Sequence, residues 1–196
     1  MVSKASFEQL LIPHMPAAFN LAYWIMRSRD EAEDVVQEAY MLAYVAFPQF
    51  SGSSAKPWLL SIVRNASYKA LRTRKRAGNV IFFSEDLKGK DRDRVDAIPA
   101  PDPSPEGSAI AAVEREHILA ALAELSTDHR EVIVLRELEG LAYSEIAHAI
   151  AAPLGTVMSR LSRARSDLRE ALAQRMARDN SDAVPKRDLG VRSKNV

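Results

Sequence analysis

The stretch that decides the fold runs from Leu141 to Arg169 and reads LAYSEIAHAIAAPLGTVMSRLSRARSDLR. Its apolar residues fall into two groups, each with the three- and four-residue spacing of a helix. The first group lies on one side of a short helix: Ile146, Ala147 and Ile150. The second group draws one stripe along the next helix: Leu154, Val157, Leu161, Ala164 and Leu168. Two such helices with a tight turn between them predict a helix-turn-helix.

The face opposite the second stripe carries short hydroxyls and arginines: Thr156, Ser159, Arg160 and Arg163. These side chains suit a DNA major groove, where phosphates and base edges accept hydrogen bonds. The alternative is a surface helix with solvated arginines, which is the commoner meaning of a basic amphipathic helix. The helix packed just upstream favours the DNA-binding interpretation.

Composition narrows the class of protein. The 196 residues include 27 basic and 26 acidic ones, so the average charge is close to zero. No apolar run approaches the ~20 residues of a membrane span, and the N-terminus, with Glu8 and Gln9, lacks a signal pattern. We therefore expect a soluble cytoplasmic protein. There is no cysteine, which excludes disulfides and thiolate metal sites.

No catalytic constellation stands out in the sequence. The four histidines lack the mutual spacing of a metal site, and no nucleophile–base pair or phosphate-binding glycine loop is present. We expect no catalytic residues, no metal and no cofactor.

The periodicity predicts two small all-α domains joined by a flexible linker. In residues 1–77, helices are expected at 7–27, with Pro13 and Pro16 near the start, then from Asp30 and from Trp58. Residues 78–107, rich in charge and proline, form the linker, whose span is roughly 30 Å relaxed and about 100 Å extended. Helix resumes at Ser108 in the second domain, residues 108–175. Residues 176–196 are expected to be a disordered tail.

The resemblance to a known family rests on two blocks. DEAEDVVQEAYMLAY followed by PWLLSIVRNASYKALRTRKR resembles region two, and LSTDHREVIVLRELEGLAYSEIAHAIAAPLGTVMSRLSRARSDL resembles region four, of the extracytoplasmic-function (ECF) sigma factors. That family directs bacterial RNA polymerase to promoters. The blocks have the family's order and cover most of residues 7–172 apart from the linker. The resemblance implies core RNA polymerase and promoter DNA as partners, contact of region four with the beta flap, and an anti-sigma factor as inhibitor.

An acidic face is the expected polymerase-docking site. Asp34, Gln37 and Glu38 share one side of a helix, and by resemblance they contact the beta-prime clamp helices. Charge-assisted hydrogen bonds from a basic coiled coil would suit them. The alternative is an ordinary solvated acidic face.

A basic run follows in the helix that begins at Trp58. By resemblance, Asn65 and the loop Phe50–Lys56 would shape a pocket for a flipped base of the minus-ten element. Trp58 is expected to be a core residue rather than a base-stacking one. The backbone near the melting fork would be held by Arg64, Lys69, Arg72, Arg74, Lys75 and Arg76.

Region four would read the minus-thirty-five element through the face of its second helix: Thr156, Met158, Ser159, Arg160 and Arg163. Four residues depart from the family's pattern. Met158 stands where relatives carry Lys or Arg, and Ser162 replaces a larger aromatic or His. Ala142 replaces a serine cap, and Ala151 replaces a glycine at which positive φ is expected.

Two other classes of protein compete with this interpretation. A stand-alone helix-turn-helix regulator that binds DNA as a dimer would leave the acidic face and the basic helix unexplained. An interaction module that sequesters a regulator by mimicking a sigma domain would lack the basic run and the region-four arginines. An enzyme is the class that the sequence favours least.

Overall fold

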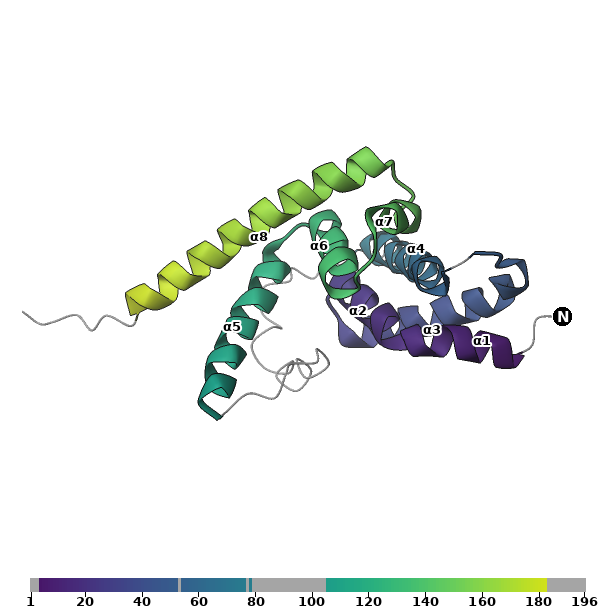
Figure 1. Ribbon diagram of the computed structural model, residues 1–196, viewed down its shortest axis with the longest axis horizontal. Coiled ribbons are helices and arrows are strands. Elements are labelled where there is room, and N and C mark those ends of the chain that lie inside the picture. The colour runs from purple at the N-terminus through teal and green to yellow at the C-terminus, as the bar shows by residue number, and fades with distance from the viewer. Residues whose placement is uncertain (1–3, 53, 77, 79–104, 183–196) are drawn as a thin grey trace, which may run out of the picture.

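The computed structural model describes residues 4–52, 54–76, 78 and 105–182. Every regular element in that part of the chain is helical, which confirms the predicted all-α class. In Figure 1, α1–α4 form one helical body, and the long α8 runs along α5 and α6 in the other. Two helical domains are therefore present, as the periodicity predicts.

The predicted first helix is broken near Pro13. α1 (Lys4–Leu11) and α2 (Met15–Met26) are separated by a 3₁₀ turn, η1 (Ile12–His14). Proline lacks an N–H and clashes with the preceding turn, so it is tolerated only at the start of a helix. Pro13 stands in the first turn of η1, and Pro16 stands in the first turn of α2. The expectation of one helix across 7–27 is thus wrong.

Helix α3 (Arg29–Ala46) packs against α2 and α4 (Ala55–Arg76), with a short 3₁₀ turn, η2 (Phe47–Gln49), after it. Ser28 caps α3 by accepting a hydrogen bond from the Glu31 amide at 3.4 Å. The inner face of α3 consists of small or branched residues, which allow close helix packing: Ala32, Val35, Val36, Ala39 and Ala43. Leu42 falls on the apolar stripe of the sequence, but it is 48% exposed.

The second domain contains α5 (Pro105–Glu124), α6 (Thr127–Ile133), a π-helical turn η5 (Val134–Leu138), α7 (Tyr143–Ala149) and α8 (Leu154–Asp182). Helices α7 and α8 form the predicted helix-turn-helix. Val157, Leu161 and Ala164 are buried as expected, whereas Leu154 is 49% exposed at the start of α8.

The turn between α7 and α8 confirms the backbone expectation for Ala151. Its φ is +50°, in the left-handed region that favours glycine. Ala142 is the N-cap of α7 and contributes no side-chain hydrogen bond, although the Glu145 carboxylate accepts from the Ala142 amide at 2.8 Å. Of the two reciprocal hydrogen bonds of a capping box, only the one between the Glu145 side chain and the Ala142 amide is therefore present.

Two sequence-based boundaries differ from the structure. Helix α5 begins at Pro105 rather than at Ser108, and α8 continues to Asp182, well into the predicted tail. Residues 79–104 of the predicted linker and 183–196 of the predicted tail lie outside the described residues. Asp128 and Glu131 have the sequence spacing of a capping pair, but Ser126 caps α6, accepting from the His129 amide at 3.3 Å.

The two domains pack against each other. Helix α2 contacts α6 and η5, and α4 contacts α7. One cluster of buried apolar residues is continuous from Phe7 in α1 to Ala164 in α8. The linker length allows the domains to sit well apart, but this structure holds them together, and their contact affects the candidate DNA-binding side chains.

Candidate nucleic-acid and polymerase interfaces

The acidic face of α3 lies at the surface of the first domain. Asp34 and Gln37 are exposed, and Glu38 is half-buried. The Glu38 carboxylate accepts a hydrogen bond from Lys69 Nζ at 2.7 Å, so one residue of the predicted polymerase set pairs with one of the predicted DNA set. The Lys69 side chain is 66% exposed and that of Glu38 is 41% exposed, and a pair this accessible to water contributes little to stability.

An apolar patch continues the acidic face toward the C-terminal end of α3. Its members are all largely exposed: Met41, Leu42, Tyr44 and Val45. Met41 and Val45 follow Asp34 and Glu38 at helical spacing, on the same side of α3. Exposed apolar side chains gathered in this way mark interaction surfaces. Sequence reasoning missed the patch, although the spacing of Met41 and Val45 from the acids was the available signal.

Trp58 packs in an aromatic cluster at the start of α4. Its ring lies 4.8 Å from that of Phe50 and 6.4 Å from that of Phe47, centroid to centroid. Phe47 is buried, and Trp58 is half-buried. These contacts favour the packing role expected for Trp58, in which it anchors the beginning of the loop Phe50–Lys56.

The predicted DNA-binding residues of α4 divide into two groups. Four are exposed and form no ion pair with another described residue: Asn65, Arg72, Lys75 and Arg76. The other three, of which Lys69 is also exposed, each hold a carboxylate. Arg64 pairs with Glu131 at 2.6 Å, Lys69 with Glu38 at 2.7 Å, and Arg74 with Glu31 at 2.7 Å. The four unpaired side chains can contact a ligand directly. The three paired cations can bind a phosphate only after their ion pairs with the carboxylates break.

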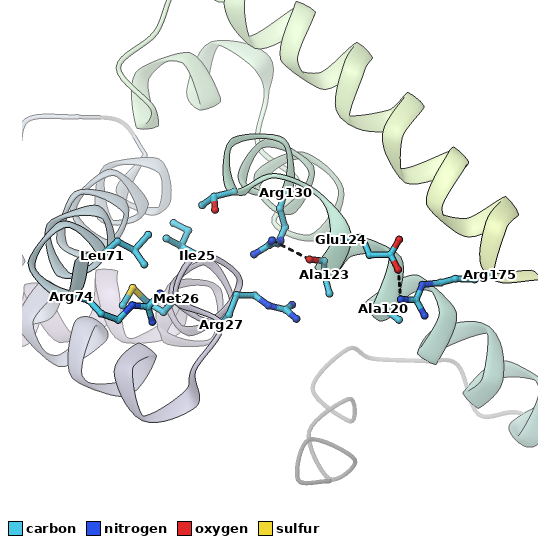
Figure 2. A pocket seen from close by; sticks show the side chains of 11 residues that line it. Ile25, Met26, Arg27, Leu71, Arg74, Ala120, Ala123, Glu124, Arg130 and Arg175 are labelled. Carbon is cyan, nitrogen blue, oxygen red and sulfur yellow. Dashed lines mark hydrogen bonds and ion pairs between the residues drawn. The ribbon is translucent and has the colours of Figure 1, made fainter. Parts of the chain in front are cut away.

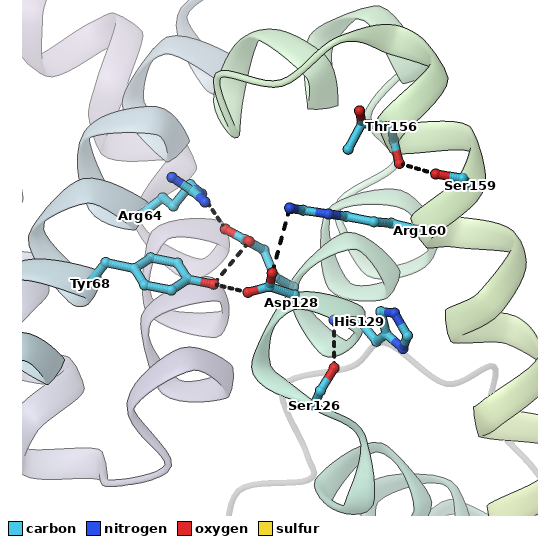
Figure 3. A network of polar contacts seen from close by, with 9 residues as sticks. Arg64, Tyr68, Ser126, Asp128, His129, Thr156, Ser159 and Arg160 are labelled. Carbon is cyan, nitrogen blue, oxygen red and sulfur yellow. Dashed lines mark hydrogen bonds and ion pairs between the residues drawn. The ribbon is translucent and has the colours of Figure 1, made fainter.

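The Arg64 contact belongs to a polar network between the domains, which Figure 3 shows. The Tyr68 hydroxyl donates to Glu131 Oε2 at 3.2 Å and to Asp128 Oδ1 at 3.1 Å. The Arg64 guanidinium lies 4.6 Å from the centroid of the Tyr68 ring. Burial raises the pKa of Glu131, which is 1% exposed, and the adjacent Arg64 opposes that increase. Burial also raises the pKa of Tyr68, so its hydroxyl remains a donor at neutral pH.

The face of α8 carries the candidate minus-thirty-five residues as expected. Met158, Ser159 and Arg163 are exposed, while Thr156 and Arg160 are half-buried. Ser159 donates to the Thr156 carbonyl oxygen at 3.0 Å. Arg160 Nη2 lies 3.5 Å from Asp128 Oδ2, so this arginine points back toward α6 (Figure 3).

Arg130 is an anchor residue that sequence reasoning missed. Its guanidinium donates to the carbonyl oxygens of Leu122, Ala123 and Leu125 in its own domain, at 3.0, 3.3 and 2.6 Å. It also donates to the Trp24 carbonyl oxygen of α2 at 2.8 Å, across the domain contact. Burial lowers the pKa of Arg130 to about 10, which leaves it charged at neutral pH.

A cavity of about 510 Å³ lies beside Arg130, where the two domains meet (Figure 2). Arginines from both domains line it, together with apolar side chains such as Ile25 and Leu71. Each of the four arginines has a contact of its own. Arg27 lies over the Trp24 ring, Arg74 pairs with Glu31 and Arg175 with Glu124. The cavity is therefore a gap between packed domains rather than a built ligand site.

Neither a cluster of metal ligands nor a membrane-spanning helix is found in the described part of the chain. There, no three His, Cys, Asp or Glu side chains gather in a way that could hold a metal ion. No described helix combines the length and the hydropathy that a bilayer crossing requires.

Both halves of the chain match known protein families. The Sigma-70 region 2 family matches residues 10–77, and the Sigma-70, region 4 family matches residues 115–168. The chain is 32% identical over 178 residues to the RNA polymerase sigma-H factor of Pseudomonas aeruginosa, covering 86% of this chain and 87% of that protein. It is 31% identical over 169 residues to the ECF RNA polymerase sigma factor SigE of Mycolicibacterium smegmatis, covering 86% of this chain but 62% of the relative.

One solved structure is similar to this chain over most of its length. It is the sigma factor RpoE from Bartonella quintana, crystallised in complex with the anti-sigma factor NepR. The identity is 32%, the TM-score is 0.66, and the likeness covers 85% of this chain and 96% of that chain. The fold and both matched regions define a sigma-70-type protein. The chain belongs to the ECF family of RNA polymerase sigma factors.

Proposed function

We propose that this chain binds core RNA polymerase and directs it to promoters. The observation that carries the proposal is the presence, in one chain, of an acidic and apolar face on α3, a cationic helix α4 and a helix-turn-helix whose second helix is α8. These three surfaces correspond to docking, capture of melted DNA and reading of duplex DNA. Residues 1–77 perform the first two tasks and residues 108–175 the third, with 78–107 as the linker.

Docking uses the α3 face. Asp34, Gln37 and Glu38 accept hydrogen bonds from the beta-prime clamp helices, and the neighbouring apolar patch is covered in the same contact. Carboxylates rimming exposed apolar side chains match the usual composition of a specific interface, in which buried apolar area is surrounded by polar groups.

Promoter reading is divided between α4 and α8. Asn65 and the cations of α4 take the minus-ten strand once it is melted, with the cations following the phosphates. Thr156, Met158, Ser159, Arg160 and Arg163 face the minus-thirty-five duplex. An arginine there can bind a guanine with two hydrogen bonds, worth about 1–3 kcal/mol of discrimination. Met158 offers an apolar contact to a thymine methyl rather than a phosphate contact.

The chain carries out no chemistry of its own under this proposal, because nucleotide addition belongs to the polymerase. It acts in the cytoplasm, where polymerase and promoter DNA meet. An anti-sigma factor controls it, as the complex of RpoE with NepR suggests for a relative. Co-expression with a co-encoded candidate inhibitor tests this control: a candidate that neither binds the chain nor lowers transcription is excluded.

Run-off transcription on genomic fragments, with core polymerase with and without the chain, tests the proposal. We expect specific transcripts only when the chain is present. Asp34→Ala removes an exposed carboxylate of the docking face and lowers transcript yield, whereas Glu116→Ala removes an exposed carboxylate of α5 and leaves it unchanged. Binding of duplex DNA by the chain alone, without polymerase-dependent transcripts, would support a stand-alone regulator instead.

A matched pair of arginines tests the role of α8. Arg163 and Arg169 are both exposed on this helix, and only Arg163 belongs to the candidate minus-thirty-five face. Arg163→Ala is expected to weaken duplex promoter binding by polymerase with this chain by about 1–3 kcal/mol. Arg169→Ala is the control. Equal losses of binding in the two variants would show that Arg163 contributes only nonspecific positive charge.

A further inference from the structure

Two apolar side chains lie exposed at the start of the candidate duplex-reading helix. Leu154 is the first residue of α8 and is 49% exposed, and Met158, one turn later, is 53% exposed. Residues four positions apart lie on the same face of a helix, with their Cβ atoms about 5–6 Å apart. The two side chains therefore form one small apolar surface, which we call the apolar edge of α8.

The apolar edge lies on the side of α8 that faces η5. Arg165 follows Met158 by seven residues, which is close to two helical turns, and its guanidinium donates to Glu137 of η5 at 2.7 Å. The other side of α8 faces α6, where Arg160 lies 3.5 Å from Asp128 (Figure 3). The beginning of α8 thus has an apolar side toward η5 and a polar side toward α6.

Hydrogen-bonding side chains occupy the face between these two sides. Ser159 and Arg163 are exposed there, one turn apart. A helix-turn-helix places the N-terminal residues of its second helix against the base edges of the major groove. Leu154 and Met158 belong to the first five residues of that helix, so they enter the groove together with Ser159.

The chemistry of the apolar edge selects one group on the base edges. The C5 methyl of thymine is the apolar group that the major groove presents. Leucine has no hydrogen-bonding group in its side chain, and the thioether of methionine is only a weak acceptor. Against a G·C pair, either side chain would cover polar atoms without giving them a partner, which is unfavourable. Against a thymine methyl, apolar surface of both molecules leaves water, which is favourable.

The spacing of the pair suits two neighbouring base pairs. One turn of an α-helix advances about 5.4 Å, whereas successive base pairs of B-DNA are about 3.4 Å apart. Leu154 and Met158 are therefore too far apart to contact one methyl group and close enough to contact two adjacent ones. The unbranched side chain of Met158 can adapt to the exact position of its methyl group.

We propose that the apolar edge reads the methyl groups of thymines at two neighbouring base pairs of the minus-thirty-five element. Leu154 thereby joins the residues that determine which promoters the chain selects, and the ligand of the pair is the C5 methyl group itself. The inference rests on the proposed function and deepens it, because it names the chemical group that this part of α8 recognises.

The first experiment removes methyl groups from the DNA. A promoter duplex found by run-off transcription is synthesised with each thymine of its minus-thirty-five element replaced in turn by deoxyuridine, which lacks only the C5 methyl. Binding is measured with core polymerase carrying the full chain. We expect two neighbouring thymines at which the replacement lowers affinity about fourfold, the factor that corresponds to one buried CH₂ group. Replacement of the other thymines is expected to leave affinity unchanged.

The second experiment repeats these measurements with variants of the chain. Leu154→Ala and Met158→Ala are each expected to abolish the loss caused by deoxyuridine at one of the two positions and to retain it at the other. Met176→Ala alters another exposed methionine of α8 and is the matched control, which keeps both losses. Arg163→Ala lowers affinity but also keeps both losses, because a guanidinium contacts hydrogen-bond acceptors rather than methyl groups.

The inference and the proposed function fail in different ways. Unchanged affinity for every deoxyuridine duplex, or losses that persist in both Leu154→Ala and Met158→Ala, overturns methyl reading, while transcription by the wild type leaves the proposed function standing. Weaker binding of these two variants to core polymerase without DNA, measured by fluorescence anisotropy, would assign the apolar edge to a protein contact and also overturn methyl reading. Absence of any polymerase-dependent transcript overturns the proposed function and the inference with it.

Discussion

Arg64 Nε in α4 lies 2.6 Å from Glu131 Oε1 in α6, across 67 positions of the chain. The first residue belongs to the candidate minus-ten surface, and the second is a buried carboxylate of the other domain. The contact joins the electrostatics of DNA binding to the packing of the domains. A change in one therefore alters the other.

The apolar patch on α3 predicts a polymerase-binding defect without a folding defect. Met41→Ser/Val45→Ser removes two side chains that are 66% and 76% exposed, so the free energy of unfolding is expected to change by about 0.5 kcal/mol or less. Affinity for core polymerase is expected to fall about tenfold. Met176→Ser, at a 58% exposed position of α8, is the control. Equal polymerase affinity in the double variant and the control, measured by fluorescence anisotropy, would place the docking surface elsewhere.

Arg130 predicts a large loss of stability when it is replaced. Arg130→Met leaves carbonyl oxygens of α2 and of the α5–α6 junction without their donor. We expect the free energy of unfolding, measured by urea denaturation, to fall by about 3 kcal/mol. Arg169→Met, at an exposed position of α8, is expected to change it by about 0.5 kcal/mol or less. Comparable losses in the two variants would rule out an anchoring role for Arg130.

The left-handed backbone of Ala151 predicts a stabilising substitution. Ala151→Gly removes the steric penalty of a Cβ at φ +50° and is expected to raise the free energy of unfolding by up to about 1 kcal/mol. Ala152→Gly is the matched control, since this neighbour does not have positive φ, and it is expected to destabilise the chain. Thermal unfolding followed by circular dichroism measures both. A lower midpoint for Ala151→Gly would contradict the prediction.

The lowered pKa of His14 predicts that the free energy of unfolding falls in mild acid. Burial lowers its pKa, Lys56 adds to the decrease, and Glu139 opposes it. His14 of the unfolded chain therefore binds a proton at a higher pH, about 6.5, than His14 of the folded chain does. The stability associated with neutral His14 is present above that pH and is lost as pH falls through the lower, folded pKa.

Urea denaturation of the wild type and of His14→Gln, at about pH 7.5 and about pH 5.5, checks this prediction. The wild type is expected to lose more stability on acidification than the variant does. His148→Gln, which alters an exposed histidine of α7, is expected to behave like the wild type. An identical pH dependence in wild type and His14→Gln would assign the acid sensitivity to other groups.

The helix-turn-helix was predictable because its signals are local. The spacing of Val157, Leu161 and Ala164 specifies which face of α8 is buried, and the three residues are buried. The positive φ of Ala151 was also expected, because the family that the sequence resembles carries glycine at this position of the turn. Periodicity was less informative at helix ends. Leu42 and Leu154 fit an apolar stripe, but they are 48% and 49% exposed.

The pairing of residues across the domains was not predictable. Asp128 and Glu131 have the spacing of a capping pair, but their carboxylates contact Tyr68, Arg64 and Arg160 instead. In the sequence, no motif distinguishes Arg130 from the other basic residues. Its four carbonyl partners lie on two separate segments, α2 and the α5–α6 junction, and no spacing within the sequence relates the two segments.

The sequence by itself determined the all-α class, the two helical domains, the helix-turn-helix and the membership of the sigma family, because these depend on local periodicity and on motifs in order. Only the tertiary structure decided which candidate DNA-binding cations are exposed and which are held by carboxylates. The physical reason is range. A helix arises from neighbours three and four positions apart, whereas the contact of Arg64 with Glu131 depends on how two separately folded surfaces meet in space.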